Sequence, residues 1–168
     1  MPRARPCAAL ALLLALLGSA CRAPDPKAEI ELRDLEGYWA VDPTVGETQY
    51  LAPVVRFKLQ NKASEAWSIQ AMATFRREDD DQTWSAAAIV SPVKDQPLKM
   101  GEPALVVLKP EGEGRYTYRG SVTDMLQHQD FKDFTATVFV KVGRSSWTPF
   151  GDVKIERRLG SHAVEAFK

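Results

Sequence analysis

Cysteine and histidine are scarce in this sequence, and their few positions exclude several kinds of chemistry. Two cysteines are present, Cys7 and Cys21, and both lie within the first 21 residues. The chain from Arg22 onward therefore lacks the means for a disulfide, a thiolate metal site or a cysteine nucleophile. The two histidines, His128 and His162, lie far apart in the sequence and do not make an ordinary zinc ligand set. We expect no metal and no cofactor.

An excess of one charge is also missing, as is a long apolar run beyond the first 20 residues. The chain has 22 basic and 22 acidic side chains. Because no basic surplus is available to neutralise phosphates, nucleic acid is not expected as a partner. After Cys21, no apolar run approaches the roughly 20 residues of a membrane-spanning helix. The composition indicates a water-soluble body.

The start of the chain does contain an apolar run, within the three-part pattern of a secretory signal peptide. Arg3 and Arg5 provide positive charge, residues 8–17 are apolar, and small residues lead up to Cys21. The run is shorter than the roughly 20 residues of a membrane span. We expect this segment to direct export and to be removed as residues 1–20.

The end of this segment, LGSAC closing at Cys21, resembles the lipobox of bacterial lipoproteins. It departs from that pattern at Gly18, where a branched aliphatic residue is commoner, and an ordinary cleaved signal is the alternative. The resemblance implies cleavage before Cys21 and a diacylglyceryl group on the cysteine sulfur, so the protein would be held on a membrane by lipid. Gram-negative sorting keeps lipoproteins with Asp after this cysteine in the inner membrane. Arg22 therefore favours the periplasmic face of the outer membrane.

Removal of the signal leaves 148 residues with 20 basic and 22 acidic side chains. This length is enough for one domain with its own core. We expect a lipidated cysteine and tether over residues 21–27, a domain over residues 28–160 and a tail over residues 161–168. The prolines of the tether favour extended backbone and disfavour helix or sheet.

Two neighbouring stretches, residues 51–61 and 67–76, alternate between apolar and polar side chains with the period of a half-buried strand. In the first, Val55, Phe57 and Leu59 point to one side. Turn-forming residues separate the two stretches, so they predict an antiparallel pair with one buried face.

The remaining pattern predicts further short strands and one helix. Strands are predicted over residues 84–90, 104–108, 115–119, 134–142 and 152–159. Residues 28–39 fit a strand or a helical turn equally well. A short helix is predicted over residues 121–129, with Ser121 as its N-cap. The fold class that follows is all-β, a single antiparallel β-sandwich with one short helix.

The segment FKLQN, Phe57–Asn61, is followed by a polar gap and by a second alternating stretch that ends in Phe75. This arrangement resembles the immunoglobulin-like modules of bacterial surface proteins, FxLYD-type domains among them. The resemblance covers only part of the chain. It implies an immunoglobulin-like sandwich and says little about a role.

Few residues are candidates for chemistry. Ser121, Asp124 and His128 share a face of the predicted helix and suggest a Ser-Asp-His set, but no G-x-S-x-G motif is present. A triad is built from separate elements around an oxyanion hole, so helix capping is the favoured interpretation. The acidic cluster Glu78–Asp81 lacks the spacing of a calcium loop, which favours a solvated hairpin tip. We assign no catalytic residue and no metal ligand.

The loop predicted over residues 143–151 is the preferred place for a partner contact, through Arg144, Trp147 and Phe150. Large apolar side chains are unusual in a solvated connection, and Trp and Arg are favoured at binding hot spots. The alternative is that Trp147 and Phe150 fold back and plug the end of the sandwich. The other tryptophans are predicted to lie in the core: Trp39, Trp67 and Trp84.

These features predict a non-enzymatic, lipid-anchored envelope protein that presents a β-sandwich to another envelope protein or complex. The alternative is a small-molecule or glycan binder that uses exposed aromatic side chains such as Trp147. A hydrolase with an unrecognised site is a third hypothesis. The sequence does not identify the partner.

Overall fold

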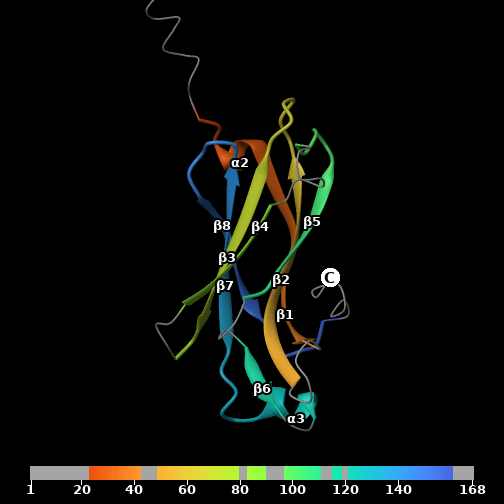
Figure 1. Ribbon diagram of the computed structural model, residues 1–168, viewed down its shortest axis with the longest axis vertical. Coiled ribbons are helices and arrows are strands. Elements are labelled where there is room, and N and C mark those ends of the chain that lie inside the picture. The colour runs from red at the N-terminus through yellow and green to blue at the C-terminus, as the bar shows by residue number, and fades with distance from the viewer. Residues whose placement is uncertain are drawn as a thin grey trace, which may run out of the picture.

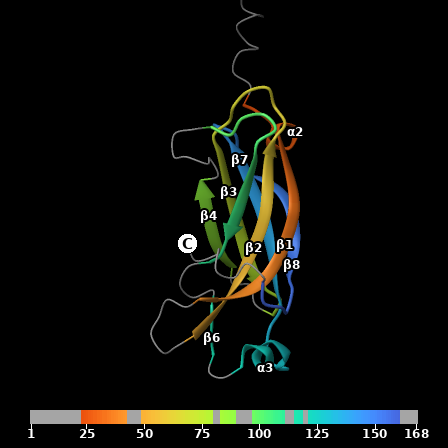
Figure 2. The same cartoon turned by 90° about the vertical axis from the view of Figure 1, so that its right-hand side faces the viewer.

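The computed structural model describes residues 23–42, 49–79, 83–89, 97–110, 115–118 and 121–160. Over these residues, antiparallel strands form two sheets that pack face to face, accompanied by two helices of four and six residues (Figure 1). Figure 2 shows the sheet that contains β1, β2 and β5 in front of the other layer. The predicted all-β sandwich is confirmed.

The first sheet contains β1 (Ile30–Asp42), β2 (Gln49–Asn61) and β5 (Pro103–Leu108) in that order, and β6 (Tyr116–Tyr118) pairs with the start of β2. The second sheet has the order β4 (Thr83–Ile89), β3 (Ile69–Arg77), β7 (Phe134–Val142) and β8 (Thr148–Ile155). The described helices are α2 (Pro26–Glu29) and α3 (Val122–Gln127). They lie at opposite ends of the sandwich (Figure 1).

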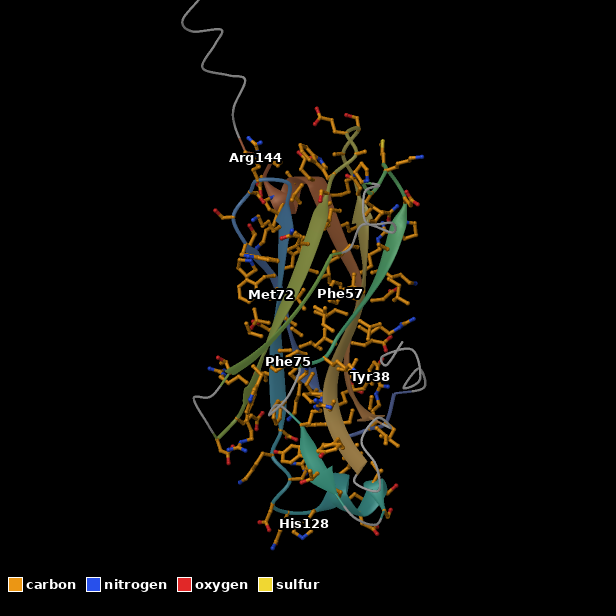
Figure 3. The ribbon with its side chains drawn as sticks, in the orientation of Figure 1. Tyr38, Phe57, Met72, Phe75, His128 and Arg144 are labelled. Carbon is orange, nitrogen blue, oxygen red and sulfur yellow. The ribbon has the colours of Figure 1, made fainter. Side chains whose placement is uncertain are left out.

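The core lies between the sheets and is built by alternate residues of each strand. Phe57 of β2 and Phe75 of β3 are fully buried, and Figure 3 shows both between the layers. In β7 every second residue is buried over the whole strand, from Phe134 to Val142. The inner faces predicted from the period of two are therefore confirmed in all three strands.

The predicted pairing of residues 51–61 with residues 67–76 is wrong. β2 pairs with β1, β5 and β6, whereas β3 pairs with β4 and β7, so the two strands belong to different sheets. Alternation shows only that a strand buries one face. A strand that lies across the core therefore has the same pattern as a hydrogen-bonded neighbour. Residues 62–68 carry the chain from one layer to the other.

Strand β8 begins earlier than predicted, at Thr148 instead of Asp152. Thr148 and Pro149 extend the ladder because they pair with Val140 and Phe139 of β7, before a register shift further along the strand. The loop predicted over residues 143–151 is therefore a shorter turn.

The segment around Pro26 also differs from the prediction of an extended tether. A turn of α-helix begins at Pro26, where the missing N–H of proline is not needed. The Asp25 side chain caps this turn by accepting a hydrogen bond of 3.1 Å from the Lys27 backbone N–H. The ambiguous stretch that follows is a strand, β1. The predicted helix is confirmed as α3, with Ser121 as its N-cap.

One side of the sandwich is closed by hydrogen bonds between β1 and the chain that follows β8. The Glu156 N–H donates to the Gly37 carbonyl at 3.1 Å, and the Trp39 N–H donates to the Arg158 carbonyl at 2.9 Å. Gly37 is needed for this approach, because a Cβ there would lie 2.6 Å from the Lys154 carbonyl oxygen. The close contact ties the first sheet to the second.

Aromatic side chains fill the core near α3. Trp39 is fully buried, and its ring centroid lies 4.9 Å from Phe131 and 5.4 Å from Phe134, both in edge-to-face geometry. Trp84 stacks on Phe134. Trp39 thus lies in the core as predicted, while Trp67 and Trp84 are partly buried and pack against it. Within the described residues, no helix has the length and apolar character needed to cross a bilayer.

Candidate interaction surfaces

The structure separates the three side chains predicted to contact a partner. Arg144 is exposed in the β7–β8 turn, and Trp147 keeps 38% of its surface exposed just before β8. Phe150 lies within β8 and packs against the core. Phe150 therefore matches the plug alternative, whereas Arg144 and Trp147 remain at the surface.

The β7–β8 turn is held in shape by its own serine. The Ser145 side chain is buried and its hydroxyl accepts a hydrogen bond of 3.0 Å from the Val142 N–H. The Ser145 N–H donates in return to the Val142 carbonyl at 2.9 Å. Gly143 takes a positive φ of 52°, which glycine adopts without strain. The turn therefore presents Arg144 and Trp147 from a defined backbone.

A row of apolar side chains crosses the outer face of the second sheet. Met72 of β3 is paired with Phe139 of β7, which is paired with Pro149 of β8. The neighbours of Met72 and Phe139 along their strands are buried, so these two side chains point outward. Pro149 is paired with Phe139 and therefore lies on the same face. Met72 and Phe139 are partly exposed and Pro149 is exposed.

Trp147 extends this row toward the β7–β8 turn. Trp147 directly precedes Thr148, the first residue of β8, which pairs with β7, and it is two residues from Pro149 along the chain. We call Met72, Phe139, Trp147 and Pro149 the outer apolar patch. No sequence motif marks it. The signal that could have revealed it is an aromatic residue, Phe139, at an outward position of a clear strand.

The outer face of the first sheet has the opposite character near α2. Ion pairs join Glu31 to Arg33 at 2.6 Å within β1 and Asp34 of β1 to Lys58 of β2 at 2.8 Å. The hydrogen bond from Lys58 lowers the pKa of Asp34 below its ordinary value. Leu105 of β5, paired with Lys58, is 49% exposed beside this charged surface.

Further along the same face, the end of the described chain covers a small apolar cluster. Tyr38, Ala40 and Val54 are buried there, apart from the main core. Gly160 lies so close to the Tyr38 ring that a Cβ would be 2.1 Å from it, and Arg158 lies over the ring at 5.9 Å. Figure 3 shows Tyr38 and Met72 on opposite sides of the central layer of side chains.

A shielded ion cluster lies where the chain enters β7. The Asp133 carboxylate is 16% exposed and lies 2.5 Å from Arg157 Nε and 2.9 Å from Lys154 Nζ. Burial raises the pKa of Asp133, but the hydrogen bonds and charges of Arg157 and Lys154 outweigh burial, so the pKa lies below its ordinary value. Arg157 also donates to the Phe131 carbonyl at 2.8 Å.

The residues considered for catalysis have structural partners. The Ser121 hydroxyl accepts a hydrogen bond of 3.4 Å from the Asp124 N–H at the start of α3, and His128 Nδ1 accepts one of 3.2 Å from the Asp130 N–H beyond its end. Ser121 caps the start of α3 with its side chain, and His128 is the cap at the other end through its backbone N–H, which donates to the Met125 carbonyl at 3.1 Å. In the acidic cluster, Asp79 is paired with Arg77 and Lys132, and residues 80 and 81 lie outside the described residues.

Across the described ranges, no group of three or more His, Cys, Asp or Glu side chains is placed to hold a metal ion. Cys21 and His162 lie outside the described residues. Comparison with protein-family models and with curated proteins finds no match. The functional conclusion therefore depends on this chain's own residues.

Proposed function

We propose that this chain is a non-enzymatic, lipid-anchored protein of the bacterial cell envelope that presents its β-sandwich to another envelope protein. The lipobox-like sequence ending at Cys21 supports the anchor, and Arg22 supports the outer membrane. The outer apolar patch supports the interaction. The immunoglobulin-like, FxLYD-type resemblance of the sandwich stays a prediction.

The proposed interaction is supported mainly by the row of apolar side chains formed by Met72, Phe139 and Pro149, with Trp147 at its end. Sheets that face water normally alternate apolar residues inward with polar residues outward, and the first sheet follows this rule near α2. Contiguous exposed apolar side chains mark binding surfaces in soluble proteins. Aromatic and Met side chains are enriched where proteins meet, which favours a protein partner.

The anchor is tested by changing the acceptor cysteine. Cys21→Ser removes the sulfur that would be acylated, so the protein should no longer incorporate a fatty-acid probe such as labelled palmitate and should no longer sediment with membranes. The unchanged chain is the control and should do both. Incorporation of the probe into Cys21→Ser would contradict the lipoprotein assignment.

The interaction surface is tested with a photoreactive amino acid at position 139 in the full chain in cells. We expect one discrete protein adduct from position 139 and none from position 105, an exposed site on the other sheet that serves as the matched control. Trp147→Ala should abolish the adduct without lowering the melting temperature. A hot-spot tryptophan contributes about 2 kcal/mol or more, roughly thirtyfold in affinity.

Two results would overturn this assignment of the surface. Equal adducts from positions 139 and 105 would show contact without selectivity. An adduct that resists proteases but is removed by glycosidases would instead support the glycan-binding alternative, with Trp147 as a stacking platform.

A further inference from the structure

Four separate segments meet at the end of the sandwich where the described chain begins, and we call this the anchor end. The Lys62 N–H donates to the Glu29 carbonyl of α2 at 2.8 Å, and the Trp67 indole donates to the Glu29 carboxylate at 3.4 Å. The Gly101 N–H donates to the Asn61 carbonyl at 2.8 Å.

The fourth segment is the β7–β8 turn, where the Gly143 N–H donates to the Ser68 carbonyl at 2.8 Å. Figure 3 places Arg144 at this end and His128 at the opposite end. The anchor end is therefore a single hydrogen-bonded surface.

The anchor end cannot lie far from the membrane if Cys21 is acylated. Cys21 precedes Asp25, the cap of α2, by four residues. Four residues at full extension span about 14 Å, which is the greatest distance the tether allows. Strand β2 alone has 13 residues and is about 40 Å long, so the α3 end can stand well away from the bilayer while the anchor end cannot.

The charges of the anchor end are formally balanced, but their surroundings differ. Its exposed cations are Lys27, Lys62, Lys99 and Arg144, and among the described residues none of them forms an ion pair. The carboxylates of Asp25, Glu29 and Glu102 each accept a hydrogen bond from a neutral N–H of the protein. Glu65 is also exposed at this end. The Lys62 ammonium donates a hydrogen bond of 3.1 Å to the Lys27 carbonyl, which leaves its charge unneutralised, so all four exposed cations can still meet an anion.

Met100 provides an apolar contact on the same surface. Its side chain is 65% exposed, and its backbone bridges to Asn61, beside the segment that joins α2. An exposed, flexible apolar side chain among exposed cations fits the boundary between lipid headgroups and acyl chains, where apolar groups are buried and cations meet phosphates.

We propose that the anchor end rests directly on a phospholipid bilayer, with Lys27, Lys62, Lys99 and Arg144 against lipid phosphates and Met100 among the headgroups. This inference rests on the proposed acylation of Cys21. The sandwich then stands end-on, with the outer apolar patch facing sideways and accessible to a protein in the same membrane.

The test measures how close two sites lie to the bilayer in the acylated full chain. After Cys21 is acylated no other cysteine remains, so Met100→Cys and His128→Cys each provide a single site for a fluorophore. The protein is reconstituted in vesicles of phosphatidylcholine and phosphatidylglycerol that contain a lipid with a nitroxide on its headgroup. We expect the label at position 100 to lose most of its fluorescence and the label at position 128 to keep it.

Each other outcome decides against the proposal. If the acylated protein floats with the vesicles and neither label is quenched, the lipid contact is wrong while the anchor stands. If both labels are quenched equally, the domain does not stand end-on. If the protein is neither acylated nor bound to vesicles, the anchor itself fails, and the lipid contact fails with it.

Charge variants test whether the anchor-end cations contact lipid phosphates or are merely held close to the bilayer by the tether. Lys62→Gln, Lys99→Gln and Arg144→Gln together should restore much of the fluorescence at position 100. The matched control replaces three exposed cations near the start of β7, at the other end of the sandwich, Arg76→Gln, Lys132→Gln and Lys154→Gln, and should leave the quenching unchanged. Equal effects of the two triple variants would overturn the role given to the anchor-end cations.

Discussion

The two outer faces of the sandwich share a backbone architecture and differ in their side chains. The face of β4, β3, β7 and β8 carries the outer apolar patch, with Met72 paired to Phe139 and Phe139 to Pro149. The face of β1, β2 and β5 carries ion pairs near α2, such as Asp34 with Lys58. Toward α3 that second face also becomes apolar, but there Tyr38 is covered by Gly160.

This difference between the two faces shows that apolar surface outside the core can serve either folding or binding. Where this chain covers its own apolar cluster, the burial stabilises the fold. Where an apolar row stays partly exposed, it offers little to folding and is available to a partner. The same kind of substitution should therefore have different consequences on the two faces.

The largest expected effect comes from truncating one aromatic ring on each face. Tyr38→Ala should lower the free energy of unfolding by about 3–5 kcal/mol, the usual cost of removing a buried aromatic side chain. Phe139→Ala should cost about 1 kcal/mol, because its ring is already partly hydrated. Denaturant unfolding of both variants, with linear extrapolation to water, measures the two values.

Phe57→Ala provides the reference, since Phe57 is fully buried between the sheets. Its loss of stability should resemble that of Tyr38→Ala. If Phe139→Ala instead matched Phe57→Ala, the patch would be part of the core and the distinction between the faces would be lost.

A smaller loss of stability is expected when a shielded charge, Asp133, is removed. Asp133→Asn should cost about 1–3 kcal/mol at pH 7, because it removes charge-assisted hydrogen bonds with Arg157 and Lys154. The folded-state pKa of Asp133 lies below its unfolded value, so its stabilisation is present above that unfolded value and is lost as pH falls through the folded pKa. The gap between parent and variant should therefore close below about pH 4. Melting curves from pH 7 to pH 2 measure it, and a gap that widened on acidification would contradict the assignment.

The smallest effect is expected on the charged face. Lys58→Met removes the ion pair with Asp34, in which both side chains are about half exposed. Exposed pairs contribute little because water and salt screen them. The change in unfolding free energy should not exceed replicate error, and raising the salt concentration should not alter the variant relative to the parent. A clear loss that salt abolishes would show that this pair stabilises the sheet.

The strands and their buried faces could be predicted from residues close together in the chain. Phe57 and Phe75 are inward-facing because each alternates with polar neighbours, and the structure buries both. Their pairing could not be read in the same way. The neighbour of a strand is chosen by contacts far along the chain, and β3 pairs with β7, more than 50 residues later, instead of with the adjacent β2.

The candidate surfaces show the same limit. Arg144 and Trp147 were predicted as contact residues from their types and their place in a connection, and they are exposed, whereas Phe150 packs inward because β8 begins earlier than its sequence suggests. Met72 was not predicted. Met72 belongs to an apolar surface only because β7 pairs with β3 and places Phe139 beside it.

By itself the sequence determined the all-β class, the buried face of each clear strand and the cap of α3, because each depends on the order of residues within a few positions. The tertiary structure alone decided which strands share a sheet, that Gly160 covers Tyr38, and that Met72 and Phe139 form one surface. Those features depend on contacts between residues far apart in the chain, and local periodicity contains no information about which distant segment supplies the contact.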